Sequence, residues 1–189
     1  MVRDTSLKTR KVIGMGILVS KITYGICCFS GATAEQLDRV RTSYHKCIRA
    51  MYGVTISDRI PLAVMRKQLS LLSFNSLIKF FDITTFAKII LTNQPRNLAK
   101  HITQFSRVSR AINKGNCRIN FTPKSQKTKN SFLFRACAHF NSIPPQLKKQ
   151  ISKKSFSKKL KEYLLSEDLP GNDEVNWPDD QNSSQHAGV

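Results

Sequence analysis

Acidic residues are missing from the middle of this chain. Between Ile83 and Lys161, 79 successive positions contain no Asp or Glu, and the same stretch holds eighteen Lys and Arg. A surface that needs charge only for solubility mixes both signs, so a basic stretch without carboxylates indicates a surface for a polyanion. Residues 1–165 hold all 31 Lys and Arg but only six of the twelve acids, and therefore carry +25 against +19 for the whole chain.

Long apolar runs are also missing. Lys21 interrupts the apolar stretch that begins at Val12, and no small-residue cleavage site follows it. We therefore expect a buried helix there rather than a signal peptide or a membrane span. The charge makes nucleic acid the first partner to consider and an anionic membrane surface the second. We expect an intracellular protein, in the nucleus or the cytoplasm.

Paired cysteine motifs are absent as well. The five cysteines include no Cys-x-x-Cys pair, which argues against a ribbon-type zinc site and favours free thiols in a reducing compartment. His45-x-Cys47 and Cys137-x-His139 could supply four metal ligands, but residues two apart on a helix point to different faces. We predict no metal site and no cofactor in this chain.

No catalytic motif is recognisable in the sequence. A Walker-type glycine loop, a His-Glu-x-x-His motif and a nucleophile elbow are all absent. Asp4, Asp58 and Asp82 are scattered, and the Asp179-Asp180 pair lies in an acidic tail without flanking strands. We therefore predict no catalytic residue.

Apolar periodicity predicts a mainly α fold. Apolar residues surround a helix from Ser6 to Phe29, which indicates a central helix covered by its neighbours. Thr33 begins a second helix with a capping-box spacing to Gln36, Gly53 ends it, and the short connection predicts an antiparallel hairpin. Further helices are expected at 61–69 and 73–92, and a last helix, capped by Ser152 or Ser155, is expected to reach Leu165.

These patterns divide the chain into four regions: a helical bundle (1–93), a basic loop or linker (94–130), a small C-terminal helical unit (131–165) and an acidic tail (166–189). Within the basic region, residues 117–121 could form a short strand. Residues 132–140 fit a strand and a helix equally. The tail is predicted to be disordered because it combines paired acids with Gly and Pro.

Phosphate contacts are expected from the Lys and Arg of the basic stretch, because each neutralised phosphate releases counterions. The candidate residues are Arg107, Arg110, Lys114, Arg118, Lys124, Lys127, Lys129, Arg135, Lys153, Lys154 and Lys158. Such contacts recognise the backbone and an A-like shape more than sequence. The segment from 103 to 130 could instead be a solvated linker.

Two blocks of sequence have recognisable motifs. The first contains Ile22-Thr-Tyr-Gly25 and Lys46-Cys-Ile-Arg49, and the second contains Phe140-Asn-Ser-Ile-Pro144 followed by a Lys-rich helix from Phe156 to Leu165. Together they resemble the region after the polymerase palm in non-LTR retrotransposon reverse transcriptases of the jockey, CR1 and RTE kind. Between them, Gln68-Leu-Ser-Leu-Leu-Ser73 stands where the family has a Leu-Gly-x-Leu-Ser-like segment.

The resemblance covers residues 7–165, with Phe29 and Phe140 at positions where the family often has Trp. It implies a thumb-side part of an RNA-directed DNA polymerase that holds RNA or an RNA–DNA hybrid. The catalytic aspartates and Mg²⁺ would belong to a missing palm, so the chain alone is expected to be inactive. The palm and endonuclease portion is then an expected partner, and Val12 to Phe29 would be partly exposed if the palm normally covers it.

Two other classes of protein fit the composition. One is a small non-enzymatic host protein that uses a basic helical module to bind RNA or DNA. The other is a peripheral membrane protein that uses the same basic surface.

Overall fold

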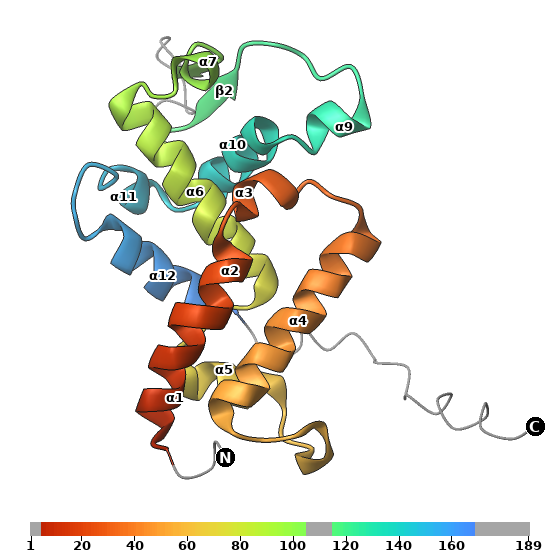
Figure 1. Ribbon diagram of the computed structural model, residues 1–189. Coiled ribbons are helices and arrows are strands. Elements are labelled where there is room, and N and C mark those ends of the chain that lie inside the picture. The colour runs from red at the N-terminus through yellow and green to blue at the C-terminus, as the bar shows by residue number, and fades with distance from the viewer. Residues whose placement is uncertain (1–4, 105–114, 169–189) are drawn as a thin grey trace, which may run out of the picture.

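The computed structural model describes residues 5–104 and 115–168 and is mainly helical (Figure 1). The chain begins with α1 (Leu7–Gly14), a π-helical turn η1 (Met15–Val19) and α2 (Ser20–Thr23), and α3 (Ile26–Phe29) follows after a break. Gly25 makes this break because its φ of 69° lies in the left-handed region that favours glycine. The single helix expected from Ser6 to Phe29 is therefore interrupted.

The hairpin and its caps match the sequence prediction. Helix α4 (Ala34–Tyr52) packs against α1 (Figure 1). The Thr33 side chain accepts a hydrogen bond from the Gln36 amide, and the Gln36 side chain accepts one from the Thr33 amide, which completes the capping box. Gly53 ends the helix with φ 84°.

The central helix is α6 (Phe74–Thr92), which follows α5 (Leu62–Leu69). Ser73 caps α6 as predicted, because its hydroxyl accepts a hydrogen bond from the Ser76 amide at 3.1 Å. Helices α3, α10 and α12 all pack on α6, and Figure 1 shows it running through the middle of the molecule.

The basic region contains more regular structure than a linker would. It holds α7 (Arg96–Ala99), β1 (Ile102–Gln104), β2 (Cys117–Ile119) and α9 (Gln126–Lys129). The two strands are antiparallel, with Ile102 opposite Ile119. The strand predicted at 117–121 is confirmed at its first three residues, whereas its partner β1 was not predicted.

The C-terminal part consists of α10 (Phe132–Ser142), α11 (Pro145–Lys148) and α12 (Phe156–Glu167). The helical alternative for 132–140 is thus the observed one. The ring centroids of Phe86 on α6 and Phe140 on α10 lie 5.4 Å apart. One hydrophobic core therefore includes residues from both the N-terminal bundle and the C-terminal helices.

The start of the predicted tail is ordered. Helix α12 continues to Glu167, and the Asp168 carboxylate accepts hydrogen bonds from the Ser73 amide at 2.7 Å, the Ser73 hydroxyl at 2.8 Å and the Ser76 hydroxyl at 2.6 Å. The prediction of disorder is therefore wrong for 166–168, because Asp168 is held by the Ser73 amide and by the Ser73 and Ser76 hydroxyls at the start of α6. Residues 169–189 lie outside the described part of the chain.

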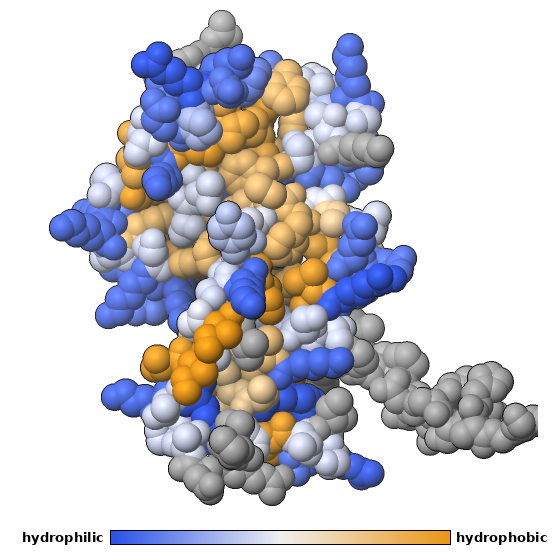
Figure 2. Space-filling model, viewed as in Figure 1, coloured by the Kyte–Doolittle hydropathy of each residue, from blue (hydrophilic) through white to orange (hydrophobic). Residues whose placement is uncertain are grey.

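The first helices do not form the covered centre that their apolar sequence predicts. Val12 is 66% exposed, Tyr24 is 87% exposed, and Ile13 and Ile17 are also exposed. Helix α4 covers one side of this segment, where an added Cβ at Gly14 would collide with Met51. The opposite side carries a hydrophobic patch over α1 and η1, which Figure 2 shows.

Candidate nucleic-acid interface

Eleven residues were predicted to contact phosphate, and the structure describes the side chains of seven of them. Arg107, Arg110 and Lys114 lie outside the described residues, and so does the side chain of Lys127. The seven that can be placed are Arg118, Lys124, Lys129, Arg135, Lys153, Lys154 and Lys158. Six of them form two separate groups, and Arg135 belongs to neither.

The first group lies where the small sheet is, at the end of the molecule formed by α7, β2 and α9 (Figure 1). Five exposed cations belong to this sheet-end surface: Arg96, Lys100, Arg118, Lys124 and Lys129. Within residues 5–104 and 115–168, none of them forms an ion pair with a carboxylate. Their charges are therefore available to an external anion.

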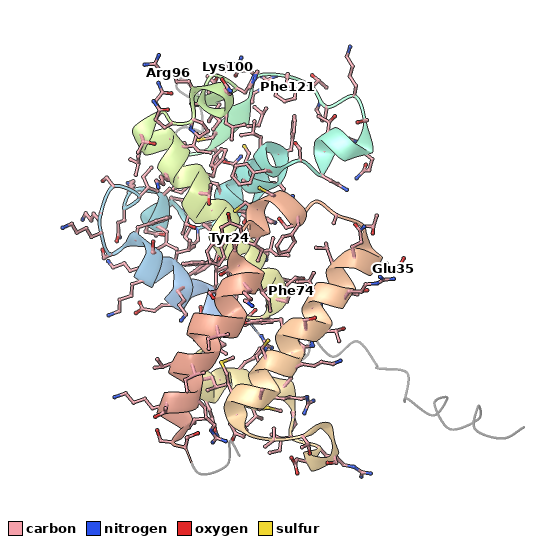
Figure 3. The ribbon with its side chains drawn as sticks, viewed as in Figure 1. Tyr24, Glu35, Phe74, Arg96, Lys100 and Phe121 are labelled. Atoms are coloured by element: carbon pink, nitrogen blue, oxygen red, sulfur yellow. The ribbon has the colours of Figure 1, made fainter. Side chains whose placement is uncertain are left out.

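Local geometry explains why these side chains point outward. Cys117 and Ile119 are buried on either side of Arg118, because successive strand residues face opposite sides. Arg96 and Lys100 stand one helical turn apart, since the Lys100 amide donates to the Arg96 carbonyl at 3.1 Å. Figure 3 shows both side chains at this end of the molecule.

Arg96 and Lys100 were not among the predicted contacts. The acid-free stretch from Ile83 to Lys161 contains both of them, so that stretch was the signal that could have identified them. Asn120 connects α7 to β2, because its side-chain amide donates to the Lys100 carbonyl at 3.3 Å and its backbone amide donates to the His101 carbonyl at 2.9 Å. These two bonds hold the end of α7 beside β2.

The second group precedes and begins α12. Lys153, Lys154 and Lys158 are all exposed, because the inward face of α12 carries Phe156 and Leu160. In Figure 1, α12 lies away from α7 and β2. The structure therefore places the predicted contacts on two surfaces rather than one.

Arg135 is the exception. Its Nε lies 2.7 Å from Asp82 Oδ2 and its Nη2 3.2 Å from Asp82 Oδ1. Its remaining hydrogen bonds go to the carbonyl of Asn130 at 2.7 Å and the carbonyl of Cys27 at 2.9 Å. Because four of its five N–H donors are used within the protein, we leave Arg135 out of the proposed interface.

Asp82 links α6 to α10. It is 0% exposed, and the His139 Nδ1 lies 3.1 Å from its Oδ2, beside Arg135. A cavity of about 490 Å³ opens next to this cluster, lined by Ser30, Lys79, Arg135, His139 and Asp168 among others. Among the described residues, no hydroxyl or thiol is hydrogen-bonded to the His139 ring. The contacts that are present connect α3, α6 and α10.

Cys117 and Cys137 are buried in the core, whereas Cys27 and Cys47 are partly buried and Cys28 is exposed. The Cys137 thiol donates to the Cys117 carbonyl at 3.3 Å, and burial, followed by the nearby Cys137, raises the pKa of Cys117 to about 11. In the part of the chain that the structure describes, no three His, Cys, Asp or Glu side chains come together as possible metal ligands.

Among the described residues, the helices are all too short or too polar to cross a membrane. Comparison of the chain with protein-family models, with curated proteins and with solved structures finds no significant match.

Proposed function

We propose that this chain binds RNA or an RNA–DNA hybrid through the phosphate backbone. The observation that carries the proposal is the sheet-end surface, where five exposed cations have no carboxylate partner among the described residues. Exposed Lys and Arg bind phosphates and release counterions, which gives affinity without sequence preference. The three exposed lysines Lys153, Lys154 and Lys158 supply a second, smaller surface.

A salt titration tests this function. If about six phosphates are neutralised, affinity for an RNA–DNA hybrid should fall roughly a thousandfold between 50 and 200 mM salt. An Arg118→Gln, Lys124→Gln, Lys129→Gln variant should lower the slope of log affinity against log salt by about 2.7, since each contact contributes about 0.9. A flat titration for the unaltered chain would exclude the proposal.

A matched control removes the same number of charges elsewhere. Lys8, Lys46 and Lys67 are exposed on α1, α4 and α5. Replacing all three with Gln should leave the salt slope within about one unit of the wild-type value. A drop equal to that of the sheet-end variant would show that net charge, and not this surface, determines binding.

We further propose that the chain is the thumb-side part of a retrotransposon reverse transcriptase. This proposal rests on the motifs Ile22-Thr-Tyr-Gly25 and Phe140-Asn-Ser-Ile-Pro144. The hydrophobic patch of Val12, Ile13, Ile17 and Tyr24 supports it, because a patch of this kind marks a surface that another protein covers. The palm and endonuclease portion is the proposed covering partner, and it would supply the aspartates and Mg²⁺ for polymerisation.

Two measurements test this origin. Palm and endonuclease sequences should be encoded next to this one, and the purified chain should self-associate in size-exclusion chromatography because its patch is uncovered. Primer extension by the chain alone, without any palm, would contradict the proposal. An adjacent coding region with no polymerase motif would favour the host nucleic-acid-binding protein.

A further inference from the structure

Phe121 is an exposed aromatic residue at the edge of the sheet-end surface. It follows β2 directly and is 40% exposed. Figure 3 shows its side chain at the same end of the molecule as Arg96 and Lys100. Arg118, three residues earlier, is also exposed. An exposed ring thus stands among cations that lack carboxylate partners in the described part of the chain.

Two neighbouring rings hold Phe121 in place. The His101 ring lies 5.1 Å from it between centroids with an interplanar angle of 77°, and the Phe134 ring lies 5.1 Å away at 88°. Both contacts are perpendicular, so neither ring stacks parallel to Phe121. The hydrogen bond from the Asn120 amide to the His101 carbonyl joins the segments that carry Phe121 and His101.

A fixed and partly exposed ring at the same end of the molecule as exposed cations suits the binding of a single-stranded nucleic acid. The cations bind the backbone, and the aromatic ring stacks an unpaired base, whatever its identity. The bases of a duplex are already stacked on each other, so a protruding ring adds little to duplex binding. The chemistry of the surface therefore favours a nucleotide whose base is free.

We propose that Phe121 stacks one unpaired base of single-stranded RNA or DNA, while Arg96, Lys100 and Arg118 bind the adjacent phosphates. This inference rests on the proposed nucleic-acid function and adds that the preferred ligand has at least one unpaired nucleotide, as in a single strand or the overhang of a hybrid. Phe121 is a binding residue in this arrangement, and His101 and Phe134 are positioning residues.

The test compares a single strand and a blunt duplex of equal length, using the full chain at low salt. A Phe121→Leu variant keeps an apolar side chain but has no ring face. It should bind the single strand about tenfold more weakly, while duplex binding changes less than twofold. Phe121→Tyr should bind like the unaltered chain. Leu91→Ala is the control, because Leu91 is an exposed apolar residue on α6.

A spectroscopic measurement makes the test independent of any variant. A strand with one 2-aminopurine should show a change in base fluorescence when the unaltered chain binds it, because the probe base stacks on the ring. Equal single-strand affinity of the unaltered and Phe121→Leu chains would overturn the stacking proposal alone. Failure of the unaltered chain to bind either nucleic acid would overturn the proposed function as well.

Discussion

The buried ion pair between Asp82 and Arg135 allows a quantitative prediction about how strongly α6 and α10 are held together. An Asp82→Asn variant keeps the shape of the side chain but leaves the Arg135 guanidinium beside a neutral amide. Removing one partner of a buried ion pair costs about 3–5 kcal/mol. Because the Arg135 side chain retains 14% exposure, we expect the lower end, a loss of about 3 kcal/mol in the free energy of unfolding.

Urea denaturation followed by circular dichroism measures this loss. The control is Asp38→Asn, the same substitution in the exposed ion pair with Arg41, where the Asp38 side chain is 60% exposed. Solvent screens such a pair, so the control should lose less than about 1 kcal/mol. If Asp82→Asn destabilises the protein no more than Asp38→Asn does, then this cluster does not join α6 to α10 and the argument against Arg135 as a phosphate contact fails.

Three further predictions concern single residues. Burial, followed by nearby arginine charges, lowers the pKa of His45 to about 4, so its neutral form stabilises the fold above pH 6.5. Urea titrations should show this contribution disappearing as the pH falls from about 6.5 to 4, and His45→Gln should flatten that decline. Asp168→Ala should lower the free energy of unfolding by about 2 kcal/mol because it removes three hydrogen bonds to Ser73 and Ser76 and the ion pair with Arg66, whereas Glu162→Ala, at an exposed site, should change the thermal midpoint little. Gly53→Ala should destabilise by about 1 kcal/mol or more because φ is 84° and Arg10 occupies the space, while Gly16→Ala, with no atom within 4 Å, should not lower the thermal midpoint.

Local signals in the sequence predicted the caps and helices well. The Thr33–Gln36 capping box, the Ser73 cap and the Gly53 terminus all occur as expected, because each depends on residues within one turn of the helix end. The outward direction of Arg118 and Lys158 also follows from the periodicity of their own elements. These features depend only on residues that are close in the sequence, so they can be predicted without knowledge of the fold.

The contacts of Arg135 could not be predicted from neighbouring residues. Its sequence neighbours include no acid, so the sequence predicts a free cation at this position. Its partner Asp82 lies 53 positions earlier, on a different helix. No local pattern connects them, because only the packing of α10 on α6 brings the two side chains into contact.

The amino-acid order by itself determined that this protein is mainly helical, where α4, α5 and α6 end, and that one long stretch contains bases but no acids. Tertiary structure alone decided which apolar helix is central. The segment from Leu7 to Thr23 and helix α6 both carry apolar residues on most sides, yet α6 is surrounded and the first segment keeps Val12 and Ile17 exposed. Burial depends on how many other elements pack around a helix, and that number is set by contacts between residues far apart in the chain.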